Sequence, residues 1–331
     1  MKRLSLLFAT MVLVFAASTM GSRVFGGTVI LRIGNNQPDS QAWNVAIKDY
    51  LIPLAAKYSG GKLEIVNYPN STLGNEPELA ESCKEGSLDM YLGDPTVGTT
   101  FCKELELFAL PFLFRDYDHW LKALDGAPGK KYADLIEGKT GMKILGYWGG
   151  SDRNVISVKR EIKTIGDLNG FKLRLAPSAL KFEVWKAIGT LPVTIAFGEV
   201  YSAMSSGLCD GMENEMPTLL ANKLYEPAKN LTLTGHEITV RPVFINAEIF
   251  NDLDNDIREA LVKAMAEATE NARRLEKESG IAAQKEMVEK FDVQIFEIAK
   301  QPIIDATAGV FKQFGENTGL TGLIGEFMAV K

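Results

Sequence analysis

Apolar and polar positions along the chain switch repeatedly between the period of a strand and that of a helix. Thr28–Gly34 is an apolar run typical of a buried strand, and Ala42–Lys57 then places apolar side chains at helical spacing before Gly60 and Gly61. Lys62–Tyr68 returns to strand alternation. The later segments of this kind are a helix at Glu76–Lys84 and strands at Ser87–Leu92, Lys143–Trp148, Lys172–Leu175 and Leu208–Met212. Such alternation predicts an α/β protein with parallel or mixed sheets that helices cover on both faces.

Two long segments predict how the chain is divided. Leu231–Ile249 favours a strand long enough to cross between two domains, and Asp254 is a suitable N-cap for a long amphipathic helix that runs toward Phe291. We expect a break in this helix at Gly280. A chain of 331 residues predicts two domains at about 150 residues each. The expected division is residues 27–150 plus 239–278 for domain I and residues 151–238 plus 279–331 for domain II.

The first 26 residues have the pattern of a secretory signal peptide. Lys2 and Arg3 precede the apolar run Leu4–Val14, and small residues follow it. This run is shorter than the roughly 20 residues that a membrane span needs. Cleavage at Ala16-Ala17-Ser18 and cleavage near Gly26 or Gly27 both remain open. Because Cys83 is the first cysteine, no lipid-accepting cysteine follows the run, and we expect a soluble periplasmic protein.

Composition narrows the classes of function. The chain is 46% hydrophobic and 24% charged, as in soluble globular proteins. Its net charge of −6 becomes −9 without the first 26 residues, which hold three basic residues and no acidic one. No basic field would therefore attract nucleic acid. Three cysteines allow buried free thiols, which we favour, or a bridge between Cys83 and Cys102.

Catalytic and metal-binding motifs are not found. Gly138-Lys139-Thr140 lacks the upstream glycine of a phosphate-binding loop, and no GxSxG sequence occurs. His236 beside Glu237 is a candidate general base, but we favour a structural hydrogen-bonding role for it. With only two histidines and no zinc-ligand spacing, we expect no metal and no cofactor.

Two arginines near glycines and aromatic residues are the strongest candidates for a binding site. Arg153 follows Trp148 closely, just past a predicted strand end, where ligand clefts of α/β sheets lie. Trp148 is therefore a candidate ligand contact. Arg174 lies on a short predicted strand beside Lys172 on the same face. Each arginine could form an intramolecular salt bridge or hold a ligand carboxylate with its guanidinium fork.

Several segments in the same order resemble one family. They are Tyr68-Pro69-Asn70-Ser71-Thr72-Leu73-Gly74, Gly86-Ser87-Leu88-Asp89, Ala109-Leu110-Pro111-Phe112, Arg153, Asp167–Leu175, Phe197-Gly198-Glu199-Val200-Tyr201 with Ala203, and Gly207–Asn214. The chain resembles the extracytoplasmic substrate-binding proteins of tripartite ATP-independent periplasmic (TRAP) transporters over nearly all of its length after residue 26. The resemblance implies a two-domain periplasmic binding protein fold with mixed sheets, crossing strands and a long helix that spans both domains.

The same resemblance implies roles for individual residues. Arg174 would hold the ligand carboxylate, Arg153 and Asn214 would assist, and Phe197 would pack on the ligand. At the positions where relatives that bind sugar acids make further polar contacts, this chain has hydroxyl-binding side chains, namely Asn36, Glu76 and Asp94. Two acidic side chains would repel a C4-dicarboxylate, so a uronate-like sugar acid is favoured. Val97 stands where sialate-binding relatives carry arginine, which argues against sialic acid.

We therefore predict a non-enzymatic, monomeric periplasmic protein that captures a small organic acid and delivers it to the membrane subunits of a TRAP-type permease. Four alternatives remain open. The ligand could be a 2-oxo acid or a C4-dicarboxylate in the same transport role. The protein could instead be a secreted enzyme acting on an acidic sugar, or a ligand sensor that docks on a receptor.

Overall fold

The computed structural model describes residues 24–25 and 27–331, so the predicted signal peptide and its cleavage site lie outside the described residues. Strand β2 (Thr28–Gly34) and helix α3 (Glu76–Lys84) begin and end where the sequence predicts. The predicted helix Ala42–Lys57 is also present, but it consists of three segments. These are α1 (Ala42–Ala46), the π-helical turn η1 (Ile47–Leu51) and α2 (Ile52–Tyr58).

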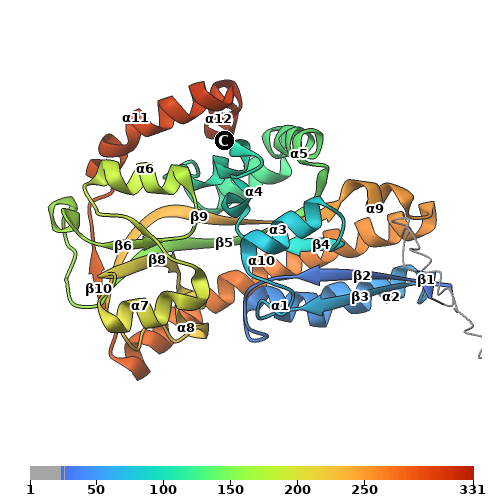
Figure 1. Cartoon of the computed structure of the whole chain (residues 1–331), viewed down its shortest axis with the longest axis horizontal. Coiled ribbons are helices and arrows are strands. Elements are labelled where there is room, and N and C mark those ends of the chain that lie inside the picture. Colours follow the sequence, from blue (N-terminus) through green and yellow to red (C-terminus); the bar gives the residue numbers. More distant parts are fainter. Residues whose placement is uncertain (1–23, 26) are drawn as a thin grey trace, which may run out of the picture.

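A single mixed sheet of ten strands runs through the described part of the molecule. Its order is β1-β2-β4-β9-β5-β8-β6-β7, with β3 beside β2 and β10 beside β9. We call β1–β4 the β2 end and β6–β8 the β7 end (Figure 1). The strands not yet given are β1 (Val24–Phe25), β3 (Leu63–Tyr68), β4 (Met90–Leu92), β5 (Met142–Ser157), β6 (Leu173–Leu175), β7 (Val193–Thr194), β8 (Gly211–Glu215), β9 (Asn230–Asn246) and β10 (Gln294–Glu297).

Two long antiparallel strands, β5 and β9, join the two ends of the sheet. Strand β9 pairs with β4 toward the β2 end, while β5 pairs with β8 toward the β7 end. The predicted crossing strand Leu231–Ile249 is therefore confirmed as β9, although it ends at Asn246, and residues 247–249 begin helix α9 (Ala247–Asp252). Strand β5 extends nine residues beyond the predicted Lys143–Trp148 segment. In the sequence, Gly149 and Gly150 mark an end of the strand. In the structure they lie within it, at a point where the register of β5 with β9 shifts.

Helix α10 (Asn255–Phe291) is a second connection between the ends of the sheet. It packs on β5, on α1 and α2 at one end, and on α8 at the other (Figure 1). Asp254 occupies the N-cap as predicted, although its side chain makes no capping hydrogen bond. The expected break at Gly280 is wrong. Ala283 and Met287 beyond it remain buried, so the apolar face of the helix continues and favours an unbroken helix.

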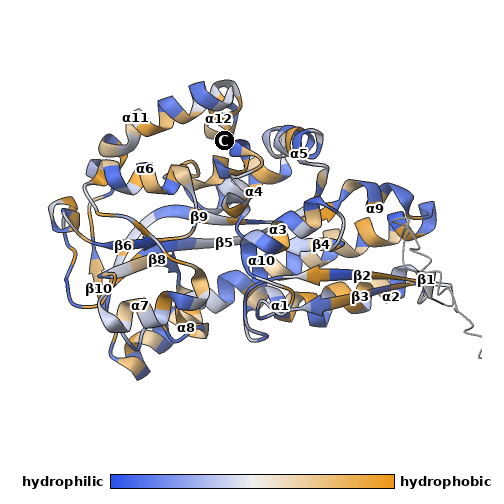
Figure 2. Ribbon diagram, viewed as in Figure 1, coloured by the Kyte–Doolittle hydropathy of each residue, from blue (hydrophilic) through white to orange (hydrophobic). Residues whose placement is uncertain are grey.

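The remaining helices cover the sheet and enclose the core. Their bounds are α4 (Tyr117–Asp125), α5 (Ala127–Thr140), α6 (Ala179–Ile188), α7 (Val200–Ser206), α8 (Met216–Ala221), α9 (Ala247–Asp252), α11 (Gln301–Thr318) and α12 (Thr321–Ala329), with short 3₁₀ turns η2 (Pro95–Gly98), η3 (Lys103–Ala109), η4 (Ile165–Leu168) and η5 (Phe197–Glu199). Many helices carry apolar and polar residues on different faces, as Figure 2 shows. No helix of residues 24–25 and 27–331 is long and apolar enough to cross a membrane.

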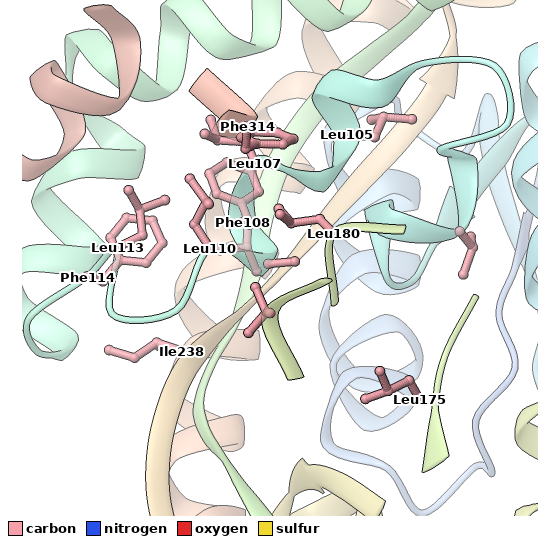
Figure 3. Close-up of a cluster of buried hydrophobic side chains, with 14 of the residues drawn as sticks. Leu105, Leu107, Phe108, Leu110, Leu113, Phe114, Leu175, Leu180, Ile238 and Phe314 are labelled. Atoms are coloured by element: carbon pink, nitrogen blue, oxygen red, sulfur yellow. The ribbon is translucent and has the colours of Figure 1, made fainter. Parts of the chain in front are cut away.

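The largest apolar cluster joins segments from both ends of the sheet. Phe108 of η3 lies in the same cluster as Leu180 of α6 and Phe314 of α11 (Figure 3). Helix α12 adds Phe327, whose ring packs edge-on to Phe108 with 5.8 Å between ring centres. The two ends are thus held together by apolar packing as well as by the long strands.

All three cysteines are buried and free, so the preferred alternative of free thiols is confirmed and the Cys83–Cys102 bridge is wrong. Burial raises the pKa of the Cys83 thiol, and burial together with a hydrogen bond to Glu104 raises the pKa of Cys102 to about 11. Both groups are therefore thiols at neutral pH.

Candidate functional site

A cavity of about 160 Å³ lies where the carboxyl ends of the short parallel strands from both ends of the sheet meet. Strands β2, β3 and β4 run parallel, as do β6, β7 and β8, and each group ends at the cavity. Ligands of α/β proteins bind at such strand ends. The cavity is lined by Asn36, Gln37, Trp43, Ser71, Asn75, Glu76, Pro77, Asp94, Val97, Arg153, Arg174, Ala176, Pro177, Ala196, Phe197, Gly198, Asn214 and Arg241.

Seven of the eight predicted site residues line this one cavity. From the β2 end come Asn36, after β2, Glu76 at the start of α3, and Asp94, after β4. Arg153 comes from β5, and the β7 end supplies the others, which are Arg174, Phe197 and Asn214. Because these residues are up to 178 positions apart in the chain, the fold alone brings them together.

Trp148 is the exception, and its prediction as a ligand contact is not supported. Its side chain is fully buried in the core formed with α10, and its indole Nε1 donates a 2.8 Å hydrogen bond to Oγ1 of Thr269. The indole N–H is therefore already used, and the ring faces α10 instead of the cavity.

Arg174 is held in place by backbone and not by a carboxylate. Its Nε and Nη2 donate hydrogen bonds of 2.9 and 2.7 Å to the carbonyl oxygen of Ile195. Among the described residues no acidic side chain lies within 4.0 Å of its guanidinium nitrogens. The centre of the guanidinium lies 5.7 Å from the ring centre of Phe197. The Nη1 end of the guanidinium therefore remains available to a carboxylate.

Burial lowers the pKa of Arg174 to about 10, although the charge of Glu213 opposes this shift, and the nearby Arg153 adds to it. The side chain is 2% exposed and still carries its charge at neutral pH. A buried cation without an anionic partner is unfavourable in a ligand-free protein. An anion in the cavity would remove that cost.

Arg153, by contrast, is neutralised by acidic residues. Its Nε lies 2.5 Å from Oε2 of Glu213, and its Nη1 lies 3.1 Å from Oε2 of Glu215. Burial alone would lower the pKa of Arg153, but the carboxylates of Glu213 and Glu237 raise it well above its ordinary value. Its charge is therefore balanced within the protein, which leaves it less suited than Arg174 to hold a ligand carboxylate.

Asp94 and Glu76 form an acidic wall of the cavity. Burial disfavours ionisation of Asp94, but Lys181, at 3.0 Å, and Arg241 outweigh it and hold the pKa of Asp94 below its usual range. Glu76 accepts a 2.7 Å hydrogen bond from the backbone N–H of Asp94 and a 2.8 Å bond from Asn36. Burial raises the pKa of Glu76. The wall thus offers an ionised acceptor beside a less acidic carboxyl group.

Three important residues were not predicted from the sequence. Arg241 and Trp43 line the cavity, and Lys181 forms the ion pair with Asp94 from α6. Arg241 could have been found, because an arginine within the predicted strand Leu231–Ile249 needs a partner just as Arg174 does. Trp43 has the spacing of a core residue in a helix, and Lys181 has the pattern of an ordinary surface lysine in a helix. The sequence therefore did not indicate that either residue belongs to the site.

His236 has the structural role that we favoured. Its Nδ1 lies 2.9 Å from Oγ1 of Thr234 and its Nε2 lies 3.3 Å from Oε2 of Glu213, and the residue does not line the cavity. Within residues 24–25 and 27–331, no group of three or more histidine, cysteine, aspartate or glutamate side chains could hold a metal ion.

Comparison with known families gives one match over most of the chain. Residues 33–317 match the bacterial extracellular solute-binding proteins of family 7, DctP. The chain is 31% identical over 245 residues to the 2,3-diketo-L-gulonate-binding periplasmic protein YiaO of Escherichia coli, covering 74% of each chain. It is 30% identical over 249 residues to the C4-dicarboxylate-binding periplasmic protein DctP of Rhodobacter capsulatus, covering 75% of this chain and 74% of that one.

Solved structures of TRAP periplasmic solute-binding proteins have the same fold. One from Roseobacter denitrificans, with bound β-D-glucuronate, superposes with a TM-score of 0.87 at 28% identity and covers 91% of this chain and 100% of its own. Another, from Xanthobacter autotrophicus with bound β-D-galacturonate, gives a TM-score of 0.86 at 28% identity, with the same coverage of both chains.

Proposed function

Since this chain belongs to family 7 of the bacterial extracellular solute-binding proteins, which serve TRAP transport, we propose that its cavity captures a uronate-like sugar acid with a single carboxylate. Membership of this family also identifies the chain as a solute-binding protein and not an enzyme, which excludes the alternative of a secreted enzyme. The ligand class is the part that we infer from the site.

The observation that carries the proposal is the charge of Arg174. Three arginines line the cavity, and two of them, Arg153 and Arg241, form ion pairs with acidic side chains. Of the three, only Arg174 has no carboxylate of the described residues within 4.0 Å of its guanidinium nitrogens, so its charge lacks a close counter-ion. One carboxylate on the ligand balances it. The planar fork and the ring of Phe197 suit such a group, and Asn214, whose Nδ2 makes no hydrogen bond within the described part of the chain, can assist.

The opposite wall supports a ligand with hydroxyl groups. Ionised Asp94 accepts hydrogen bonds, and Glu76 and Asn36 add further polar atoms. A second ligand carboxylate beside Asp94 and Glu76 would be repelled, which disfavours a C4-dicarboxylate. Val97, on the same wall, carries no positive charge that could bind a second ligand carboxylate. Galacturonate and glucuronate, which bind to the structural relatives, meet both requirements.

The transport role adds three further elements to the proposal. The protein is exported by its first 26 residues and acts in the periplasm, as its relatives YiaO and DctP do. Its two domains have the division given above and close on the ligand, with β5, β9 and α10 as the connections. The closed form then delivers the acid to the membrane subunits of a TRAP-type permease.

Calorimetric titration and thermal unfolding of the purified protein test the ligand class. The panel is D-glucuronate, D-galacturonate, succinate and pyruvate. We expect the uronates to bind, and a uronate at 100 times its dissociation constant should add about 2.7 kcal/mol to the free energy of unfolding. Succinate or pyruvate binding more tightly than either uronate would overturn the proposal.

A further inference from the structure

Two buried hydrogen-bond donors at the cavity have no partner among the residues that the structure describes. They are Nε1 of Trp43 and Nε of Arg241. Both residues line the cavity, and they are only 3% and 6% exposed. Buried donors are nearly always satisfied in proteins, because an unpaired one loses its hydrogen bonds to water and gains nothing in return. Two such donors on one cavity point to an acceptor that enters with the ligand.

The surrounding contacts fix both donors in position. Trp43 is the second residue of α1. The centre of the Arg241 guanidinium packs over its indole, 5.1 Å from the ring centre. Nη2 of Arg241 donates a 3.0 Å hydrogen bond to Oε1 of Glu215, and Nη1 lies 3.6 Å from Oδ2 of Asp94. Nη2 is thus hydrogen-bonded and Nη1 lies near a carboxylate, whereas Nε has no partner in the described part of the chain.

These donors lie on a different part of the sheet from the proposed carboxylate clamp. Arg241 is on β9 and Arg174 is on β6, with β5 and β8 between them. Three strand spacings of roughly 4.8 Å place the two backbones at least about 14 Å apart. They are also offset along β5, where Arg241 lies opposite Trp148 and Arg174 is level with Ile156. A small ligand that reaches both residues must therefore extend across the cavity, with its carboxylate near one and a different group near the other.

We propose that Trp43 and Arg241 are specificity-determining residues, whose Nε1–H and Nε–H groups donate hydrogen bonds to a hydroxyl or ring oxygen at the end of the ligand remote from its carboxylate. This inference rests on the proposed function. The acceptor is an uncharged oxygen, since Asp94 and Glu215 already balance the charge of Arg241 and would repel a second carboxylate. The site thereby selects long, oxygen-rich monoacids over short acids and over dicarboxylates.

Trp43→Phe removes the indole N–H and keeps most of the ring, so it tests the first donor directly. Trp120→Phe is a matched control. Nε1 of Trp120 is also buried without a partner in the described residues, and Arg273 lies 5.0 Å from its ring centre, but Trp120 does not line the cavity. We expect Trp43→Phe to weaken D-glucuronate binding about five- to tenfold and Trp120→Phe to leave it unchanged.

A spectroscopic measurement separates hydrogen bonding from packing. The four tryptophans give four indole N–H signals in a ¹H–¹⁵N spectrum, and the two variants assign those of Trp43 and Trp120. On saturation with D-glucuronate the Trp43 proton should move downfield and exchange more slowly with water, while the Trp120 signal keeps its position.

Each outcome decides the question. An unchanged Trp43 signal at saturating glucuronate, or equal affinities of the parent and Trp43→Phe, would overturn this inference and leave the proposed function intact. Tighter binding of succinate than of glucuronate, with the Trp43 signal moving for succinate, would overturn both. If the parent protein binds no acid of the panel, the proposed function fails first, irrespective of Trp43.

Discussion

The side chain of Arg174 has a backbone partner, the Ile195 carbonyl, and a proposed ligand partner, a carboxylate. Nε and Nη2 of its guanidinium bind the Ile195 carbonyl and so fix the position of the chain after β7, while Nη1 makes no hydrogen bond within the part of the chain that the structure describes. Its structural role and its proposed binding role therefore use different N–H groups. They can be separated by a substitution that keeps the charge.

Arg174→Lys should weaken uronate binding at least about tenfold. A single ammonium group cannot bond the Ile195 carbonyl and also present a planar fork to the ligand, and a lost charge-assisted hydrogen bond costs roughly 1.5–3 kcal/mol. Titration calorimetry measures the loss. Arg174→Ala should lose more, because no cation remains.

The ligand-free melting curve of the lysine variant is the control. If Arg174 served only to support the chain at Ile195, the variant would have a lower Tm and would bind its ligand within threefold of the parent. That result would remove Arg174 from the site.

Glu276 is a second residue whose environment predicts a measurable effect. It is 3% exposed on α10, and burial, together with the charge of Glu215, raises its pKa to about 7. Because the folded pKa lies above the unfolded value, folding takes up a proton. The stabilisation that Glu276 adds to the folded protein is therefore complete below pH 4.5, the ordinary pKa of a glutamate. This stabilisation is lost as the pH rises to about 7, the pKa in the folded protein.

Glu276→Gln should stabilise the protein at pH 8 and change little at pH 5. The amide has nearly the same shape and no charge to bury, so the gain at pH 8 is at most about 3 kcal/mol. Melting temperatures of both proteins at the two pH values measure it. A variant that is destabilised equally at pH 5 and pH 8 would show that Glu276 is ionised in the folded protein and needed as an anion.

At the scale of elements, the glycine pair in β5 is the feature most closely tied to movement. Gly149 and Gly150 have positive φ angles of 101° and 106°, and the register between β5 and β9 shifts between Gly149 and Asp152. This irregularity lies in one of the two strands that join the ends of the sheet. A bend there could change the angle between the ends without breaking the flanking β-ladder.

Gly149→Ala should lower the melting temperature clearly. The new Cβ would lie 2.5 Å from the carbonyl oxygen of Thr239, and the positive φ is unfavourable for alanine by about 1–2 kcal/mol. Gly138→Ala is the matched control, since Gly138 lies within α5 with no atom near its Cβ position. That substitution should raise stability by up to about 1 kcal/mol. Equal effects of the two alanines would refute the argument.

For the whole molecule, several polar contacts join the two proposed domains beside the cavity. Nε2 of Gln41 donates to Oγ1 of Thr218 at 2.9 Å, and Nδ2 of Asn222 donates to Oε1 of Gln37 at 3.0 Å. The ion pair between Lys181 and Asp94 is a third contact of this kind. Contacts of this kind would hold the proposed closed form together.

Ligand binding should therefore make the molecule more compact. Without ligand the polar contacts beside the cavity compete with hydration of the same groups, and a ligand that touches both walls shifts the equilibrium toward the closed form. Small-angle X-ray scattering should give a smaller radius of gyration with saturating uronate than without it. An unchanged radius at confirmed saturation would mean that the domains do not close on the ligand.

The sequence by itself determined the elements and most of the chemistry of the site. Periodicity places β2, α3 and the long crossing strand correctly, because local propensity and one-sided burial decide these segments. Ordered short motifs indicate the family, and with it Arg174, Asn36 and Asp94. Asn36 and Asp94 follow the ends of β2 and β4, and Arg174 lies on the short strand β6, so the chain direction fixes at which edge of the sheet they appear.

Only the tertiary structure decided which charges remain unbalanced. The sequence gives both Arg153 and Arg174 the same two possible partners, an acidic side chain or a ligand, yet Arg153 faces Glu213 and Glu215 across the β5–β8 pair, while Arg174 faces a carbonyl. The same holds for the indole N–H groups of Trp148 and Trp43. That of Trp148 donates to Thr269 of α10, whereas that of Trp43 has no partner among residues 24–25 and 27–331. Partners of this kind come from distant parts of the chain. Pairing therefore depends on how strands and helices pack, which no local pattern in the sequence specifies.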